Sequence, residues 1–457
     1  MSYLDTIIEN LPEVRPPKQK KPSFKEKLRW TLVILVTYFL MTHIEIYGLG
    51  DNALAQFEFL STILGASFGS LVSLGIGPIV TASIVLQLLN GSGIVNFDLT
   101  STQGKKRFQG MQKILAIFFT FVEAAVFVLM GGLAPAAGIN PMVLIVQLFI
   151  GGMFIIYMDE IVSKYGFGSG VSLFIAAGVS QEIFIQLLSP LPQLDGTAPV
   201  GIIPFIFYDL VISDSGLIDE VTRGVFRILS TLAVFAVVVY ASAMKVEIPL
   251  SFGRVKGHGV RWPLKFLYSN VIPIIFVAAL IANVQLLARL FENQGNAFLG
   301  TFVGGQPASG VVYFLTPVDL IEGLVFQTLQ LSDWGAALTY LIVYVIGSTI
   351  FSIFWVQSSG LDAKSQAKQM VSSGLQVPGF RRDIRVLERL LKRYINPLAV
   401  LGGIAIGLLA SVADLTGAVG TGTGILLTVM IVYRLYEEIA KQHVYEMNPA
   451  LRKFMGE

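Results

Sequence analysis

The chain has 457 residues, of which 54% are hydrophobic and only 14% are charged, and its mean hydropathy is +0.70. An ordinary soluble domain carries about 25% charged residues, so this composition predicts an integral membrane protein. The absence of cysteine excludes disulfides and thiolate metal sites, and the three histidines are too scattered to suggest a ligand cluster.

Ten segments are candidates for membrane crossings, because a crossing helix needs about 20 predominantly apolar residues. All are continuous apolar runs except the second, which is broken near its middle. They cover residues 28–47, 54–90, 113–133, 139–157, 170–188, 224–244, 268–290, 335–356, 395–413 and 422–440. The sequence therefore predicts an all-α membrane protein with ten transmembrane helices.

The second segment is interrupted at Gly75, Gly77 and Pro78. The apolar residues after Pro78, about a dozen, are too few to cross a membrane alone. Residues 57–64 suffice for about two turns of helix, and we expect them to dip into the membrane and return. Non-helical backbone at that depth is stable only when it is buried in protein or lines a water-filled cavity. The interruption therefore predicts a central pore.

The positive charges fix the expected orientation. With the amino terminus inside, the inner segments carry 29 of the 32 Lys and Arg residues, which follows the positive-inside rule. Only Arg223, Arg227 and Arg289 would lie outside. Residues 2–29 are polar and interrupted by prolines, so no cleavable signal is predicted. We expect a multi-pass protein of the cell membrane with both termini in the cytoplasm.

Five crossings lie on each side of a Pro-rich stretch that begins at Ser189. An odd number per half inverts the second half relative to the first, and a functional path usually lies between such halves. Gly403 and Gly407, four residues apart, suit close helix packing. The predicted regions are a cytoplasmic segment (1–27), a first half (28–188), an external hinge loop (189–223), a second half (224–440) with cytoplasmic loops 245–265 and 356–394, and a cytoplasmic tail (441–457).

The sequence gives no sign of an enzyme or of a bound cofactor. The Gly-rich run at residues 420–424 lacks the Gly-Lys-Ser/Thr that binds phosphates, and no hydrolase or metalloprotease motif is present. We therefore expect that a partner supplies the energy for any work done here.

Four motifs stand out along the chain. They are Leu74-Gly75-Ile76-Gly77-Pro78-Ile79-Val80-Thr81, Asp159-Glu160-Ile161-Val162-Ser163-Lys164-Tyr165-Gly166, Gly424-Ile425-Leu426-Leu427-Thr428-Val429 and Val432-Tyr433-Arg434. Together they resemble the SecY family, the large (alpha) subunit of the Sec protein-conducting channel, and they are most similar to its archaeal branch. The resemblance covers nearly the whole chain.

The resemblance implies a plug at about residues 54–67, a constriction ring and release of transmembrane segments through a lateral gate. The implied plug residues are Phe57, Glu58, Phe59, Leu60, Ile63 and Leu64. The implied ring residues, all aliphatic, are Ile76, Val80, Val171, Ile175, Ile275 and Leu427. An apolar ring offers a passing chain no hydrogen bonds and can close by dewetting. The alternative is that these side chains are ordinary lipid or core contacts.

Glu123 lies about ten residues into the third crossing, near the bilayer midplane. A carboxylate at that depth is costly and marks a functional candidate. The resemblance implies that Thr81 and Asn283 are its partners in a polar cluster at the lateral gate. Our hypothesis is that the three side chains latch the gate, and the alternative is that they only hold helices together.

Two basic inner loops complete the resemblance. It implies that Arg254, Lys256, Arg381 and Arg382 dock on the ribosome, whereas the alternative is that these charges only fix topology and contact anionic lipid. The implied partners are a SecE/gamma-type subunit, a small beta subunit, signal peptides, nascent polypeptides and membrane lipid, with no DNA.

A secondary transporter is the alternative function, because broken crossings and inverted repeats also occur there. A transporter should place several charged groups near the midplane, and Glu123 is the only clear one. A purely structural scaffold would not need the interruption at residues 75–78.

Overall fold

A computed structural model describes residues 8, 10–17, 22–52, 54, 64–91, 93–95, 97, 101–192, 198–211, 218–252, 259–303, 306–372, 375–376 and 383–447. Most of these residues are helical, and a helix lies within or overlaps each predicted crossing. These helices are α2 (Phe24–Thr42), α4 (Gly77–Gly91), α5 (Thr102–Leu129), α6 (Pro141–Tyr165), α7 (Gly170–Leu188), α9 (Ile218–Ala243), α10 (Ile272–Asn293), α13 (Leu331–Ser358), α15 (Ile384–Leu415) and α16 (Gly422–Met447).

Seven of the described helices are long and apolar enough, by length and composition, to cross a membrane. They are α5, α6, α7, α9, α10, α13 and α15. α4 is apolar but has only 15 residues, in keeping with the short second half of the broken segment. The chain is therefore a multi-pass membrane protein.

Polar residues fix where several helices begin. The side chains of Ser23, Ser101, Asn140 and Asp383 each accept a hydrogen bond from a backbone N–H in the first turn of α2, α5, α6 and α15. These caps satisfy donors that have no partner within the helix. In α6, Pro141 follows the cap at a position where its missing N–H costs nothing.

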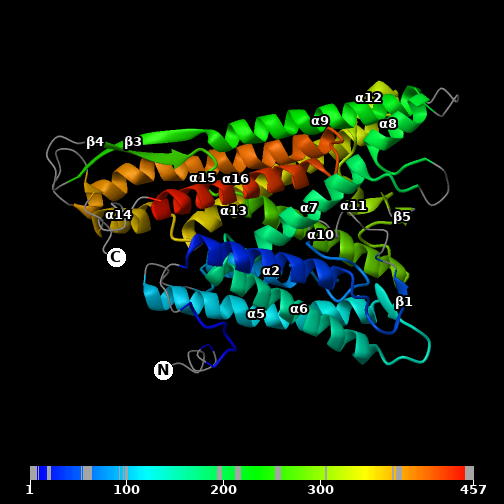
Figure 1. Ribbon diagram of the computed structural model, residues 1–457, viewed down its shortest axis with the longest axis horizontal. Coiled ribbons are helices and arrows are strands. Elements are labelled where there is room, and N and C mark those ends of the chain that lie inside the picture. Colours follow the sequence, from blue (N-terminus) through cyan, green and yellow to red (C-terminus); the bar gives the residue numbers. More distant parts are fainter. Residues whose placement is uncertain are drawn as a thin grey trace.

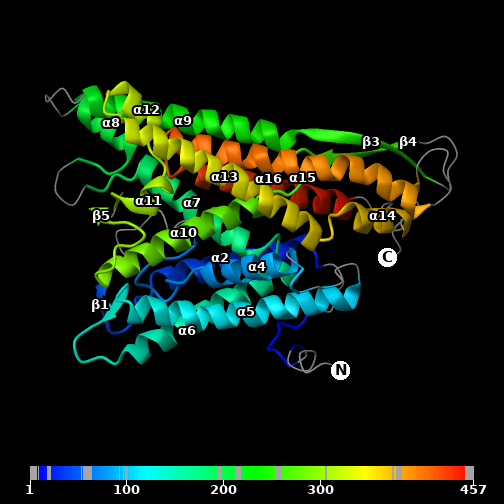
Figure 2. The same cartoon turned by 180° about the vertical axis from the view of Figure 1, so that it is seen from behind.

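The long helices run side by side along the longest axis of the molecule (Figure 1). The helices α2, α5 and α6 lie on one side, and α9, α13, α15 and α16 lie on the other. Viewed from behind, α4 lies beside α5 in the first group, and α10 lies beside α13 in the second (Figure 2). The helix α7 contacts α6 and belongs to the first group. The two groups meet along two seams, one where α4 contacts α10 and α13, and one where α2 and α7 contact α16.

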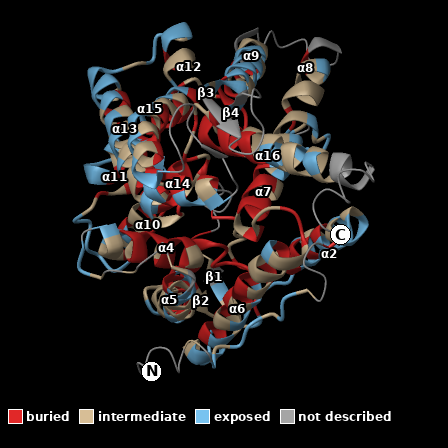
Figure 3. Ribbon diagram, turned by 90° about the vertical axis from the view of Figure 1, so that its left-hand side faces the viewer, coloured by how far each residue is buried: buried red, intermediate tan, exposed pale blue. Residues whose placement is uncertain are grey.

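Burial separates central from peripheral helices. In α10, 67% of the residues in its apolar stretch are buried, whereas the corresponding fraction in α9 is 22%. Along the helix axes, the buried residues gather toward the middle and the exposed ones on the outward faces (Figure 3). Exposed apolar side chains such as Leu232 and Phe235 on α9 fit contact with lipid acyl chains.

The expectation of a wholly helical chain is incomplete, because the structure contains three small sheets. The largest joins β3 (Lys245–Phe252) with β4 (Gly259–Lys265) and β7 (Leu375–Gln376), all within the two predicted cytoplasmic loops. The other two pair β1 (Leu49–Asn52) with β2 (Leu133–Pro135), and β5 (Phe302–Val303) with β6 (Gln306–Pro307). The strands stabilise connections between helices and leave the helical body unchanged.

Four shorter helices lie in the connections. They are α8 (Ile202–Val211), α11 (Gly310–Phe314), α12 (Leu320–Val325) and α14 (Ala363–Ser372). The β3–β4 hairpin and α14 lie at one end of the molecule, and α8 and α12 lie at the other (Figures 1 and 2). We call these the hairpin end and the α12 end.

The ninth predicted crossing starts earlier than expected. The segment 384–394, assigned to a loop, is the beginning of α15, which continues through Pro397. The predicted close packing at two glycines of α15 is confirmed. A Cβ atom on Gly403 would lie 2.8 Å from Cα of Thr349, and one on Gly407 would lie 2.7 Å from the carbonyl oxygen of Tyr344, so α15 lies directly on α13.

Candidate functional site

Of the six aliphatic side chains assigned to the ring, five belong to the main hydrophobic core of the molecule, and the sixth packs against it. They come from four segments: the turn before α4 together with α4, then α7, α10 and α16. Five of the six are 0–3% exposed, and the sixth, Val171, is partly buried. The structure thus brings together apolar residues from both halves of the chain, and none of the six can donate or accept a side-chain hydrogen bond.

Two hydrogen bonds, one from the turn before α4 and one from α2, hold the chain at Leu64 and Gly65. The backbone N–H of Ile76 donates to the carbonyl oxygen of Leu64 at 2.7 Å, and the Tyr38 hydroxyl donates to that of Gly65 at 2.9 Å. Leu64 is only 2% exposed. Of the residues assigned to the plug, Phe57, Glu58, Phe59, Leu60 and Ile63 lie outside the described residues. The described end of the segment therefore packs beside the apolar cluster.

Gly75 makes this close contact possible. Its φ of +53° is in the left-handed region, and a Cβ atom there would lie 2.2 Å from the carbonyl oxygen of Leu64. Residues other than glycine are strained in that conformation.

Replacing Gly75 with Ala is expected to displace residues 64–65 from Ile76. The strain and the overlap with backbone favour release of this segment, which we expect to raise ion leak through reconstituted vesicles at least about threefold, as for a change of about 0.7 kcal/mol. Gly131→Ala is the control, since Gly131 also has positive φ but a Cβ atom there meets nothing within 4 Å. Equal leak from the two variants would exclude a sealing role for this contact.

The polar cluster links three helices. The Thr81 hydroxyl on α4 donates to Oε1 of Glu123 on α5 at 3.0 Å and accepts from Nδ2 of Asn283 on α10 at 3.2 Å. Gly77 leaves room for the carboxylate, because a Cβ atom there would lie 3.0 Å from Oε2 of Glu123. The Asn283–Thr81 bond crosses the seam between the two groups of helices, whereas the Thr81–Glu123 bond stays within one group.

A second contact closes the same seam nearer the hairpin end. Gly91, at the end of α4, packs against the ring of Phe354 on α13, where a Cβ atom would lie 2.8 Å from the ring. On the other face of α4, the Gln112 side chain of α5 donates to the Ser83 hydroxyl at 2.6 Å. The helix α4 is thus fixed to α5 by polar contacts and to α13 by an apolar one.

The four arginines and lysines assigned to ribosome docking, Arg254, Lys256, Arg381 and Arg382, lie outside the described residues. The adjoining parts of both loops are described, and β7 pairs with β3, so the two loops meet in one sheet. Arg261 on β4 is exposed and pairs with Glu247 on β3 at 3.1 Å. The hairpin end therefore presents charged side chains on an ordered sheet.

Sequence reasoning missed a charged anchor at the hairpin end. Glu160 pairs with Lys113 on α5 and with Lys164, both at 2.8 Å, and accepts a hydrogen bond from the backbone N–H of Val14. Lys113 also donates to the carbonyl oxygen of Pro12 at 2.6 Å. These contacts hold the amino-terminal segment against α5 and the end of α6. The two acidic residues at 159–160, near the end of an apolar run, could have indicated this anchor from the sequence.

A buried carboxylate at the other end was also missed. Asp414, 5% exposed, accepts hydrogen bonds from the Tyr340 hydroxyl at 2.7 Å and from the backbone N–H of Thr423 at 2.7 Å, and the Thr423 hydroxyl also donates to it. It thereby caps the start of α16 from the end of α15. Leu427 lies one helical turn beyond Thr423, so this cap fixes the start of the helix that carries it.

The described side chains of this site pack together and form hydrogen bonds that fix the positions of the helices. None of the six aliphatic side chains is titratable, and the polar cluster contains a single carboxylate. Among the described residues, no group of three or more His, Asp or Glu side chains is arranged to hold a metal ion.

Comparison with known proteins agrees with this arrangement. The SecY family profile matches residues 70–436. Protein translocase subunit SecY of Methanothermobacter thermautotrophicus is 47% identical over 459 residues, covering 99% of this chain and 98% of the relative. The SecY subunit of Methanocaldococcus jannaschii is 43% identical over 457 residues, covering 100% of both chains.

Two solved structures are similar in fold along nearly the whole chain. One, a protein-conducting channel, has a TM-score of 0.84 at 43% identity and covers 98% of this chain and 99% of its own. The other, Sec61 in the canine ribosome–channel complex from the endoplasmic reticulum, has a TM-score of 0.81 at 42% identity, with the same coverage.

Proposed function

Because the chain belongs to the SecY family and is a subunit of a protein translocation channel, we propose that its six clustered aliphatic residues form the constriction through which unfolded polypeptides pass. The observation that carries this proposal is the convergence of four chain segments, from both halves, on one apolar cluster. A small ion crossing such a constriction loses hydration without compensation, whereas a polypeptide meets no group that would hold it. The segment ending at Leu64 and Gly65 serves as the plug.

The seam between α4 and α10 is the lateral gate in this proposal, with Thr81, Glu123 and Asn283 as its latch. The hydrogen bond from Asn283 to Thr81, which crosses this seam, supports this assignment. Once the seam opens, a segment of about 20 apolar residues gains free energy by moving into lipid, whereas a polar one stays on the axis. Soluble and membrane clients are then separated by partitioning.

The proposed topology has ten crossings, in two inverted halves, with both termini and the hairpin end in the cytoplasm. The charge distribution supports it, since 29 of the 32 Lys and Arg residues fall in inner segments. In this topology α4 is the short crossing that the plug completes, and α2 and α16 cross with their charged ends inside. The proposed regions keep the boundaries given from sequence, except that α15 begins inside the second cytoplasmic loop.

The proposed partners follow from the relatives and from the inner loops. A similar solved structure is Sec61 in a ribosome–channel complex, and we propose that Arg254, Lys256, Arg381 and Arg382 contact ribosomal phosphates in the same way. Such contacts should weaken steeply with salt. A SecE/gamma-type subunit and a small beta subunit complete the proposed assembly. The comparisons give no support to a secondary transporter.

A cysteine at Val80 tests the constriction directly, because the chain has no native thiol. We expect a stalled nascent chain with one cysteine to form a disulfide with Val80→Cys in the assembled complex. Phe235→Cys, on the lipid-facing side of α9 (50% exposed), is the control. Nascent-chain adducts at Phe235→Cys but not at Val80→Cys would rule out the proposed path, and protection of Val80→Cys by a saturable small solute would favour a transporter.

A further inference from the structure

The three arginines that depart from the positive-inside distribution lie at or near the α12 end. Arg289 pairs with Glu292, three residues along the same helix, at 2.6 Å. Arg223 and Arg227 lie one turn apart on α9 and face α12, which belongs to the connection between α10 and α13. These two arginines therefore face α12 from α9, whereas Arg289 and Glu292 contact Phe302 on β5.

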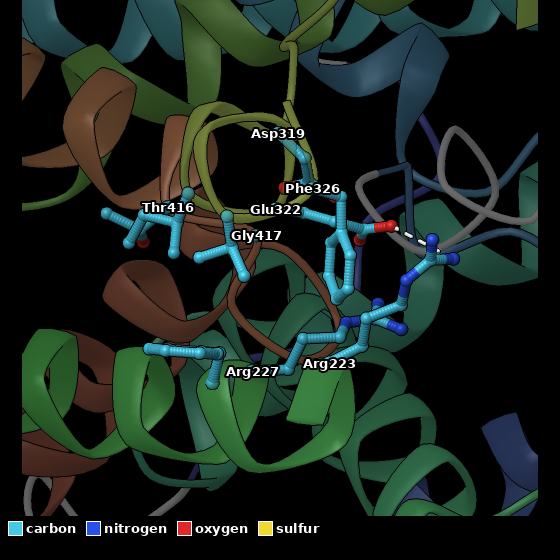
Figure 4. A pocket seen from close by; sticks show the side chains of 10 residues that line it. Arg223, Arg227, Asp319, Glu322, Phe326, Thr416 and Gly417 are labelled. Carbon is cyan, nitrogen blue, oxygen red and sulfur yellow. Dashed lines mark ion pairs between the residues drawn. The ribbon is translucent and has the colours of Figure 1, made fainter. Parts of the chain in front are cut away.

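Arg223 makes two contacts, one with α12 and one with the residue that follows this helix. Its guanidinium lies 3.4 Å from Oε1 of Glu322 and 4.4 Å from the centre of the Phe326 ring. Figure 4 shows Arg223 extending toward Glu322 beside that ring. The ion pair is partly exposed, at 44% for Arg223 and 36% for Glu322. Pairs with that exposure are weak alone, so the cation–π contact contributes to holding the arginine.

Arg227 lines a cavity of about 10 Å³, about the size of one water molecule. Within the described part of the chain, its buried Nε atom has no hydrogen-bond partner. Asp319, Thr416 and Gly417 line the same cavity. Burial raises the pKa of the Asp319 carboxyl, and the positive charge of Arg227 opposes that rise. The arrangement suits a single water between the guanidinium and the carboxylate.

Asp319 also lies directly on the turn between α15 and α16. A Cβ atom on Gly417 would lie 2.3 Å from Oδ1 of Asp319, and Gly417 has a φ of +64°. This turn is followed by α16, whose start is capped by Asp414 and whose second turn carries Leu427. One continuous set of contacts thus runs from α9 through α12 to the turn that precedes Leu427.

We infer that Arg223, Arg227, Asp319 and Glu322 form an outer brace that holds the α15–α16 turn against α9 and so positions Leu427 in the constriction. The inference rests on the proposed role of Leu427. The brace gives Arg223 and Arg227 a function on the outer side, where the positive-inside rule disfavours arginine. These four are positioning residues that do not touch the translocating chain.

The brace is tested in the purified complex with its native partner subunits, using Arg223→Glu, Glu322→Arg and the double charge swap. Hydrogen–deuterium exchange at residues 416–427 measures how readily the α15–α16 turn opens, and this measurement does not depend on translocation activity. We expect each single change, which sets like charges together, to speed exchange there about tenfold, and the double swap to restore it to within about twofold. Arg289→Glu, which sets like charges together within α10, is the control and should leave exchange at the turn unchanged.

Ion leak from vesicles with the same variants tests the link to the constriction. Leak that rises with both single changes and falls again in the double swap supports the inference. Unchanged exchange at the turn in Arg223→Glu overturns the brace. Altered exchange with unaltered leak overturns its coupling to Leu427. Failure of the proposed function itself is distinguishable, since it appears as an absence of leak when Leu427 is replaced by a charged residue in an otherwise intact brace.

Discussion

Replacing Leu427 with Asp is expected to make the closed channel leak small ions. Leu427 is 1% exposed and lies in the same apolar cluster as Ile76 and Ile275. A carboxylate there recruits water and lowers the cost of bringing a cation through the constriction. Lowering that barrier by only about 1.4 kcal/mol raises the flux about tenfold, and an ionised side chain should exceed this.

The measurement is the rate of potassium efflux from vesicles that contain equal amounts of the assembled complex. Leu427→Ile, which keeps the volume and the apolar character, should stay close to the parent. Tyr436→Asp adds the same charge to α16 at a position that is 67% exposed and outside the cluster, and it should not leak. If Leu427→Asp leaks no faster than Leu427→Ile, the cluster does not seal the channel.

Replacing Asn283 with Leu is expected to raise the hydrophobicity that a signal peptide needs. The change removes the Asn283–Thr81 hydrogen bond across the α4–α10 seam, and such a bond in a membrane contributes about 0.6 kcal/mol on average. It also partly buries an apolar side chain in the closed seam, which is worth about 1.5 kcal/mol against a hydrated open seam, the low end for burying such a side chain. The balance favours the closed gate by about 1 kcal/mol, a factor of about five in the opening equilibrium.

Asn283→Asp should act in the opposite direction. It replaces the amide donor with a second carboxyl group beside Glu123, and two carboxyl groups at short range cannot both ionise without destabilising the closed seam. Transport of a series of signal peptides, each with one Leu more than the last, measures both shifts. Gln285→Leu is the matched control, because this amide on the same helix donates to Leu315 and Thr316 within its own half. A threshold that is the same in all three variants would exclude the latch.

The course of the helices follows closely from the sequence. The fifth crossing was predicted at 170–188, and α7 spans Gly170–Leu188. A long apolar run bounded by Gly and Ser leaves little choice of helix ends, because the membrane requires every backbone group to be satisfied within the helix. The prediction was weaker at the ninth crossing, where α15 continues through Pro397 and joins its amphipathic start to its apolar part.

The β3–β4 hairpin was missed although its signal is present. Val246, Ile248 and Leu250 alternate with other residues, as do Val260, Trp262 and Leu264, and the sequence between the two runs contains glycine. Such alternation is typical of strands. It was overlooked because the charge of the loop dominated its interpretation. Ile248 and Leu264 are buried against α14 and α15, which is why the hairpin is ordered.

The candidate site shows the limit of sequence reasoning more clearly. Depth in the third crossing identified Glu123, and the family resemblance identified Thr81 and Asn283. Only the fold shows that one hydroxyl joins the other two side chains. No local pattern connects Tyr340 to Asp414, or Arg223 to Glu322, since the partners are about 70 to 100 residues apart in the chain.

Hydropathy, charge asymmetry and chain breaks are local properties, and membrane insertion responds to them segment by segment. The sequence by itself therefore determined that the chain is a membrane protein, where its helices run and where the second one is interrupted. Contacts between helices depend on which faces meet, and that is set by packing of the whole bundle. Only the tertiary structure decided the close contact of Gly75 with the Leu64 carbonyl group, the hydrogen bond across the seam and the ionic contacts at the α12 end.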